Sequence, residues 1–134
     1  MSWNTVPSLD TNCILRWLLG DVPEQMELVS TLVSFGEGVT VADAVLIETA
    51  FVLEKLKKIR RETIVTALTA VIETENIRCS RELFMDVLPV YVNHPKLSFV
   101  DCYLEALARR TGAAPLLTFD QKLAHQLSGA QLLS

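Results

Sequence analysis

Four acidic residues, Asp10, Glu48, Asp101 and Asp120, stand at places in this sequence where chemistry is often found in α/β proteins. Asp10 and Asp120 each follow a short apolar run that is typical of a strand, whereas Glu48 and Asp101 lie early in helical segments. In parallel sheets, ligands bind beyond the carboxyl ends of the strands. We therefore expect the four carboxylates to meet at one edge of a sheet.

A cluster of carboxylates needs a compensating charge. Two unit charges about 4 Å apart repel by about 4 kcal/mol at an effective dielectric constant near 20. Protonation of one or more acids is one solution, but this density of oxygen ligands is what Mg²⁺ or Mn²⁺ prefers, with waters completing the coordination. Such an ion can bind a phosphate oxygen and activate a water for attack on phosphorus. The pattern therefore predicts metal-dependent phosphodiester hydrolysis.

Each acid also has a purely structural interpretation. Asp10 and Asp120 could cap helices, and Asp101 could favour the positive end of its helix dipole. Glu48 could pair with a lysine. Because the chain contains 16 acidic residues, spacing alone leaves both interpretations open.

The elements that must position these residues alternate between short strands and helices. Strands are expected at residues 5–9, 39–41, 76–79, 115–118 and 131–133. Helices are expected after Asp10, from Pro23, after a cap at Asp43 with Phe51 facing inward, over 62–74, from Ser80, over 99–110 after a cap at Ser98, and after Asp120. The helix from Ser80 is expected to carry the apolar stripe Leu83, Phe84, Val87, Leu88 and Tyr91. Strands joined by helices pair in parallel and need helices on both faces. We expect an α/β fold, a three-layer αβα sandwich around a mainly parallel sheet of four to five strands, as one domain spanning residues 1–134.

Composition limits the setting of this domain. Half of the residues are hydrophobic and the mean hydropathy is +0.32, so a partner is expected to cover some apolar surface. No apolar run approaches the roughly 18 to 20 residues of a membrane span, and no signal-peptide pattern is present, which makes the cytoplasm the simplest location. The three cysteines, odd in number and widely spaced, are expected to be free thiols.

The charge pattern argues against a broad basic surface for nucleic acid. The net charge is −4 and the pI is near 5.1, so any contact with a polyanion must be local. The only concentrated positive charge is the basic cluster, which consists of Lys55, Lys57, Lys58, Arg60 and Arg61. It could contact RNA or an acidic protein, or it could be a solvated helix end. His94 and His125 have no evident partner for acid–base chemistry and receive no role.

Four segments together resemble the PIN-domain family, and most closely its VapC-type toxins. They are Leu9-Asp10-Thr11-Asn12 after a strand, Glu48 within VLIETAFVLEK, Phe99-Val100-Asp101 followed by Ala106-Leu107-Ala108, and Leu117-Thr118-Phe119-Asp120. Their order and spacing fit the family across essentially the whole chain. The resemblance implies an αβα fold, Mg²⁺- or Mn²⁺-dependent endoribonuclease activity, a homodimer, and inhibition by a small antitoxin protein encoded beside the toxin.

The resemblance also assigns roles to residues. Asp10, Glu48, Asp101 and Asp120 match the acidic quartet of the family. Asn12 matches a polar position that helps to hold the first aspartate, and Thr118 matches a hydroxyl position beside the last one; a helix turn and an ordinary strand threonine are the alternatives. Glu105 lies four residues after Asp101 on the same helical face, so it could support the metal ligands or pair with Arg109.

Two residues depart from the family pattern. Asp43 stands where relatives commonly have serine or threonine; we expect a helix cap, although the residue could add charge at the rim of the site. Lys122 stands where many relatives have another acid, which argues against a second tightly held metal ion; it could touch substrate phosphate or remain solvated. We therefore expect Asp10, Glu48 and Asp101 to ligate metal and activate water, and Asp120 to act through water or around a weaker second ion.

Other functions remain open at this level. A PIN-fold binding module without catalysis, held in a complex through its apolar surface, would fit the acidic net charge and Lys122. A phosphatase of the haloacid-dehalogenase type would need a second aspartate where Asn12 stands. A phosphoacceptor receiver domain would need an adjacent acidic pair near the first strand, and this pair is missing. The sequence does not indicate which RNA a ribonuclease of this kind would cut.

Overall fold

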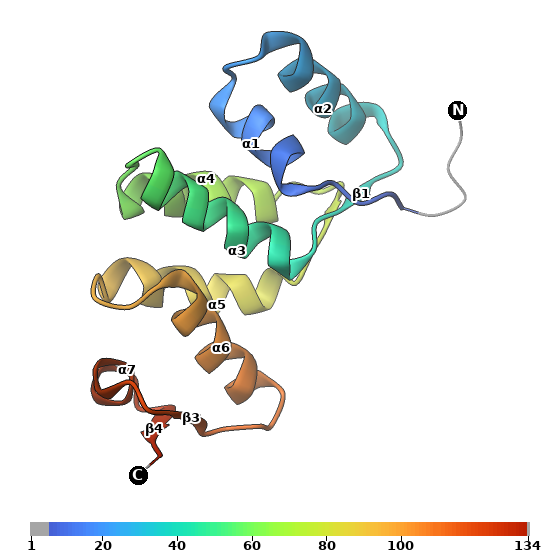
Figure 1. The fold of residues 1–134 in the computed structure, drawn as a ribbon. Helices are drawn as coiled ribbons and strands as arrows, with labels where there is room; N and C mark the ends of the chain where they lie inside the picture. Colours follow the sequence, from blue (N-terminus) through green and yellow to red (C-terminus); the bar gives the residue numbers. More distant parts are fainter. Residues whose placement is uncertain (1–5, 134) are drawn as a thin grey trace. The chain divides into compact units, whose positions relative to one another are not determined.

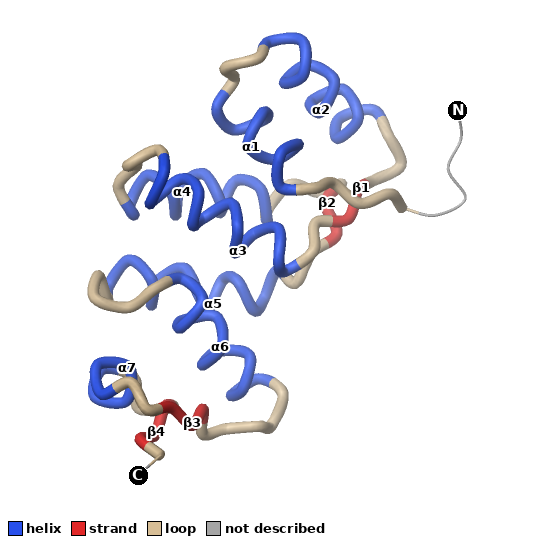
Figure 2. The backbone as a smooth tube through the Cα atoms, viewed as in Figure 1, coloured by secondary structure: helices blue, strands red, loops and turns tan. Residues whose placement is uncertain are grey.

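The computed structural model of the chain describes residues 6–133. The chain divides into two compact units, Met1–Arg81 and Glu82–Ser134. Each unit contains its own helices and its own pair of short parallel strands (Figure 1, Figure 2). The α/β character predicted from the sequence is therefore confirmed, with helices making up most of the chain.

In unit 1, parallel extended segments alternate with helices. Its elements are α1 (Thr11–Leu19), α2 (Pro23–Phe35), β1 (Val39–Thr40), α3 (Asp43–Phe51), the π-helix η1 (Val52–Leu56), α4 (Arg61–Ile72) and β2 (Ile77–Arg78). Strand β1 pairs in parallel with β2, with Val39 opposite Ile77, and Ser8 forms a parallel bridge to Thr40. Because the segment around Ser8 and strand β1 run in parallel, the chain leaves both of them at the same edge, toward α1 and α3.

Local signals set the bounds of the first two helices as predicted. The Asp10 side chain caps α1, and Gly20 ends it in the left-handed conformation with φ 63°. Pro23 then occupies the first turn of α2, where its missing N–H costs nothing. Helices α1 and α2 pack against each other in Figure 1.

Two predictions about α3 are wrong. Phe51 is 56% exposed, because Leu46, Ala50 and Leu53 occupy the side of the helix that faces the core. Asp43 is not the cap: the helix begins one residue earlier, at an N-cap Ala42 without a side-chain bond. The Asp43 carboxylate instead accepts a hydrogen bond of 2.7 Å from the Ser80 hydroxyl, just beyond β2.

Unit 2 is built around two longer helices and a strand pair. Its elements are α5 (Arg81–Asn93), which begins at the last residue of unit 1, α6 (Phe99–Arg110), β3 (Leu116–Thr118), α7 (Gln121–Gln126) and β4 (Ala130–Leu132). Strands β3 and β4 are parallel, with Leu117 opposite Gln131. The predicted apolar stripe of α5 is confirmed, since Leu83, Phe84, Val87, Leu88 and Tyr91 are all buried.

The predicted sheet of four to five strands is not confirmed. Among residues 6–133, strand pairing consists of two two-stranded sheets and the bridge at Ser8. Thr5, the start of the first predicted strand, lies outside the described residues. None of the described helices is long and apolar enough to cross a membrane.

Candidate active site

Asp10 lies where the first extended segment passes into α1. Its Oδ1 accepts a 2.9 Å hydrogen bond from the backbone N–H of Cys13. This bond, together with the backbone N–H of Asn12, lowers the pKa of Asp10 below its ordinary value of 3.8. The residue therefore carries an ionised carboxylate at neutral pH, as a metal ligand must.

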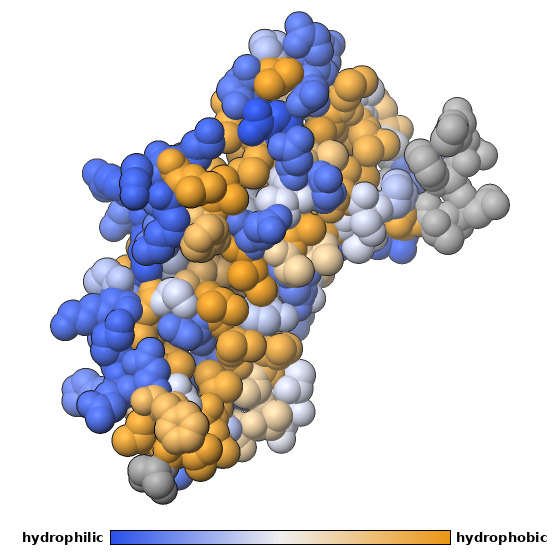
Figure 3. All heavy atoms as spheres, viewed as in Figure 1, coloured by the Kyte–Doolittle hydropathy of each residue, from blue (hydrophilic) through white to orange (hydrophobic). Residues whose placement is uncertain are grey.

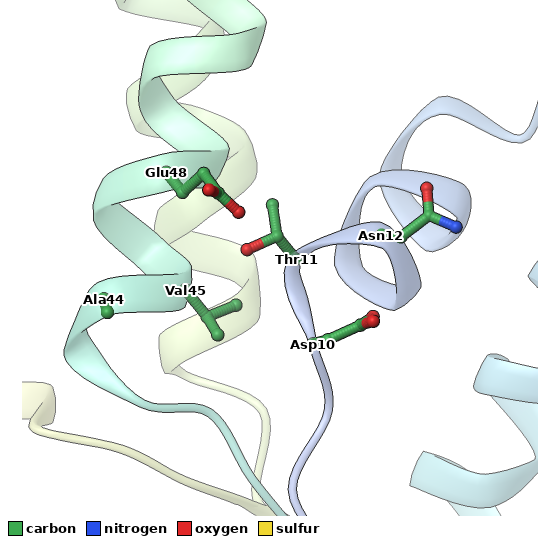
Figure 4. Close-up of a pocket in the computed structure, with 6 residues that line it drawn as sticks. All are labelled: Asp10, Thr11, Asn12, Ala44, Val45 and Glu48. Carbon is green, nitrogen blue, oxygen red and sulfur yellow. The ribbon is translucent and has the colours of Figure 1, made fainter.

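Glu48 and Asp10 line one pocket of unit 1. The pocket has a volume of about 440 Å³ and is lined by Asp10, Thr11, Asn12, Ala44, Val45 and Glu48. Figure 4 shows Thr11 between the two acids, with the Glu48 carboxylate directed toward Thr11 and the Asp10 side chain turned toward its own helix. Helices α1 and α3 thus bring together two of the four predicted acids, 38 positions apart in the sequence.

The Asn12 side chain lines this pocket as well. Within the described residues, no hydrogen bond joins its amide to the Asp10 carboxylate. Asn12 acts on Asp10 through its backbone N–H instead. The role that the resemblance implies for its side chain stays a prediction.

Asp101 belongs to the first turn of α6 in unit 2. Its backbone N–H donates to the Ser98 Oγ at 3.1 Å, and its Oδ2 accepts from the Ser98 N–H at 3.4 Å. This reciprocal pair is a capping box, in which each residue satisfies a free N–H of the helix start. Ser98 was predicted as the cap; the answering contact from Asp101 was missed, although an acid three residues after a serine is its usual signal.

Asp120 follows β3 in unit 2 and caps α7. Its Oδ1 accepts from the N–H groups of Lys122 at 2.9 Å and Leu123 at 3.3 Å. The Thr118 hydroxyl in turn accepts from the Asp120 N–H at 2.9 Å, which fixes the turn between strand and helix. Thr118 therefore lies beside the last acid, as the resemblance implies. The Lys122 side chain is exposed.

Glu105 is one of two buried polar residues among those described, with 7% of its surface exposed. Its Oε1 accepts from the Arg109 Nε at 3.3 Å, one helical turn later. Its carboxylate also packs against Gly129, just before β4. The pairing with Arg109, one of the two predicted alternatives, is thus observed.

The cysteines are free thiols, as predicted, and burial raises the pKa of Cys13 and of Cys79. Neither thiol is therefore activated as a thiolate nucleophile.

The basic cluster lies in unit 1, from η1 to the start of α4.

The predicted quartet is divided equally between the units. Asp10 and Glu48 belong to unit 1, and Asp101 and Asp120 belong to unit 2. Within either unit, the described residues include no group of three or more histidine, cysteine, aspartate or glutamate side chains placed to hold a metal ion. Each unit supplies at most two of the four predicted ligands.

The donor chemistry of the unit 1 pocket fits a hard divalent cation. Mg²⁺ in proteins is usually held by one or two carboxylates, with waters in the remaining positions. Asp10 and Glu48 supply two carboxylates, and the pocket leaves room for water and a phosphate group. No nitrogen or sulfur ligand lines the pocket, which disfavours zinc.

Comparison with known families gives a match that covers most of the chain. The sequence model described as "PIN domain" matches residues 8–126. The matched range includes all four acids and residues of both units. A search of curated proteins finds no match.

Proposed function

The chain belongs to the PIN-domain family, whose members are typically metal-dependent nucleases, and we propose that it is an Mg²⁺- or Mn²⁺-dependent endoribonuclease. The reaction is hydrolysis of an RNA phosphodiester. A water oxygen forms a bond to phosphorus, the bond from phosphorus to the bridging oxygen breaks, and the leaving oxygen takes up a proton. Because the family match runs through both units, we also propose that they form a single PIN domain.

The pocket that holds Asp10 and Glu48 is the observation that supports this function best. Two carboxylates, Asp10 at the cap of α1 and Glu48 in α3, line one hollow beyond parallel extended segments. The lowered pKa keeps Asp10 ionised, so its charge is available to a cation across the physiological pH range. We assign Asp101 and Asp120 of unit 2 to the same site on the strength of their order and spacing.

A divalent cation at these carboxylates would supply an activated water and neutralise charge on the phosphate. The residues have distinct tasks in this scheme. Asp10, Glu48 and Asp101 would hold the cation and orient the water, and Asp120 would act through water or at a weaker second ion. Asn12 helps to hold the first acid, Asp10, and Thr118 helps to hold the last acid, Asp120. Glu105 pairs with Arg109 within α6 and packs against Gly129 before β4, so it supports the helix that carries Asp101 rather than touching substrate.

The biological role that we propose is that of the toxin in a toxin–antitoxin pair. This assignment rests on the VapC-like segments around the four acids. It includes a homodimer, a cognate antitoxin protein and a cytoplasmic location. The described surface offers apolar residues for such partners, among them Leu28, Phe35, Leu117 and Phe119, each at least 52% exposed. Figure 3 shows apolar atoms gathered at the surface around α7, β3 and β4.

Replacement of single carboxylates tests the nuclease assignment. Cleavage of an end-labelled RNA in Mn²⁺ should fall by on the order of a hundredfold or more in Asp10→Asn and in Glu48→Gln, because each change removes a charged oxygen ligand. Glu75→Gln is the matched control, since Glu75 is an exposed acid outside the pocket, and should cleave like the unmodified chain. EDTA should stop cleavage by all variants. Undiminished cleavage by Asp10→Asn would refute the catalytic assignment.

A further inference from the structure

The face of α3 that carries Glu48 continues well beyond the pocket. From Asp43 through η1, the exposed side chains are Ala44, Glu48, Phe51, Lys55 and Leu56. The first four are spaced by three or four residues and so share one face, and Leu56 directly follows Lys55. We call this row the α3 face. Leu46, Thr49, Ala50 and Leu53 occupy the opposite, buried side.

The π-helix shapes the far end of the α3 face. In η1 the backbone N–H of Lys57 donates to the Val52 carbonyl, which adds one residue to the turn. The wider turn keeps both Lys55 and Leu56 on the exposed side. Lys58 then adopts a positive φ of 57°, which ends the helix and turns the chain toward α4.

Positive charge accumulates just where the α3 face ends. Glu54 pairs with Arg61 at 3.2 Å and more weakly with Lys55 at 3.4 Å, and Glu62 pairs with Arg60. Lys57 and Lys58 form no ion pair within the described residues, and the Lys55 side chain is 56% exposed. Lys57 and Lys58 therefore keep an unneutralised charge in a chain whose net charge is −4.

Phe51 is an exposed aromatic ring between Glu48 and a group of lysines, and proteins that bind single-stranded nucleic acid combine aromatic rings with positive charge. Bases stack on aromatic side chains while lysines follow the phosphates. At about 1.5 Å per residue, Phe51 lies roughly 4.5 Å and Lys55 roughly 10 Å beyond Glu48 along the helix axis. Neighbouring nucleotides of one strand can cover such a span. Figure 3 shows this end of α3 as hydrophilic atoms with apolar atoms among them.

We propose that the α3 face binds single-stranded RNA, with Phe51 stacking on a base next to the cleaved phosphate and Lys55, Lys57 and Lys58 contacting the backbone beyond it. The position relative to the cleaved phosphate rests on the proposed function, whereas the binding of RNA does not. Duplex RNA is excluded as the ligand of Phe51, because its bases are already stacked.

Binding to two oligomers of equal charge tests the stacking contact. Fluorescence anisotropy would compare octauridylate with an abasic ribose-phosphate oligomer of the same length, both in the Asp10→Asn background so that neither is cut. We expect octauridylate to bind about tenfold more tightly. Adding Phe51→Ala should remove this preference, and Phe51→Trp should keep it. Phe35→Ala is the matched control, because Phe35 lies in the same unit and is 86% exposed on α2. It should leave the affinities for both oligomers unchanged.

The lysines are tested by salt dependence. Changing Lys57 and Lys58 together to glutamine should weaken binding of both oligomers and lower the slope of log affinity against log salt by about 1.4, which corresponds to two lost phosphate contacts on a single strand. Lys96→Gln in unit 2 is the control and should leave the slope unchanged.

Several outcomes would overturn the proposal. One is a preference for octauridylate over the abasic oligomer that stays the same when Phe51→Ala is added. Another is a loss of self-association or of binding to a partner protein in Phe51→Ala while RNA affinity is unchanged, which would make the α3 face a protein interface. The proposed function fails separately: base-dependent binding without any Mn²⁺-dependent cleavage would refute the nuclease and leave the α3 face as an RNA site.

Discussion

At the scale of single residues, Asp10 has two tasks that substitutions can separate. It caps α1 by accepting the Cys13 N–H, and it is the first acid of the proposed site. Asparagine is as good a cap as aspartate, so Asp10→Asn should leave stability within a few tenths of a kcal/mol, whereas Asp10→Ala should cost about 1 kcal/mol. Urea denaturation measures both values. Equal destabilisation by the two variants would show that the charge, and not the cap, stabilises the fold.

The sequence predicted helix caps well where the N–H groups that they bind are near in the chain. The caps at Asp10, Ser98 and Asp120 depend on N–H groups two or three residues away, and all three are observed. Asp43 was predicted wrongly because its partner, Ser80, lies 37 residues later. The residues next to Asp43 in the sequence look the same whether its carboxylate caps the helix or accepts a hydrogen bond from a distant hydroxyl.

At the scale of elements, an ion pair joins α5 to α6 in unit 2. Arg110 Nε lies 2.6 Å from Asp86 Oδ2, and this guanidinium lowers the pKa of Asp86 below its ordinary value of 3.8. A carboxylate with a lowered pKa stabilises the fold above 3.8, and the contribution is lost as the pH falls through the lowered value. The pair is partly exposed, so solvent screening keeps its contribution small.

The substitution Asp86→Asn should therefore be destabilising at pH 7, and the difference should shrink as the pH falls below 3.8. Denaturant midpoints at neutral and acid pH measure this. Glu82→Gln is the control, because Glu82 is 87% exposed and lies 3.8 Å from the same arginine, and should have little effect at either pH. A difference that persists unchanged in acid would mean that packing, not charge, accounts for the loss.

The approach of β4 to α6 depends on the absence of a side chain at Gly129. A Cβ there would collide with the buried Glu105 carboxylate. We expect Gly129→Ala to destabilise the protein by about 1 to 3 kcal/mol, as overpacking does. The same change in a Glu105→Ala background should cost much less, because the obstacle is gone. A double-mutant cycle on denaturant midpoints measures the coupling, and additive costs would contradict this account.

Elements were easier to predict than their partners. Apolar spacing correctly indicated α5 and its five buried residues, because a helix is specified by neighbours along the chain. Strand pairing joins distant residues such as Val39 and Ile77, so the sequence located the short strands but did not establish one sheet. The exposure of Phe51 was missed for a related reason, since the identity of the buried side depends on what packs against α3.

At the scale of the whole molecule, the proposed site depends on residues from both units. The order and spacing of the four acids along the chain predicted a single site, and the structure brings Asp10 and Glu48 to one pocket. The proposal that Asp101 and Asp120 serve the same ion rests on the order of the four acids along the chain, because neither helical periodicity nor strand propensity predicts which distant residues share an ion.

Melting temperature in the presence of Mn²⁺ tests this assembly. An ion that binds only the folded state stabilises it, by about 2.7 kcal/mol at a hundred times its dissociation constant. If residues of both units bind the same ion, Asp10→Asn in unit 1 and Asp120→Asn in unit 2 should each abolish most of the rise in melting temperature. Glu75→Gln should retain this rise. A shift lost only in Asp10→Asn would confine the ion to the unit 1 pocket. No shift in the unmodified chain would favour a binding module without catalysis, because a carboxylate site built for a divalent cation must gain stability when it is filled.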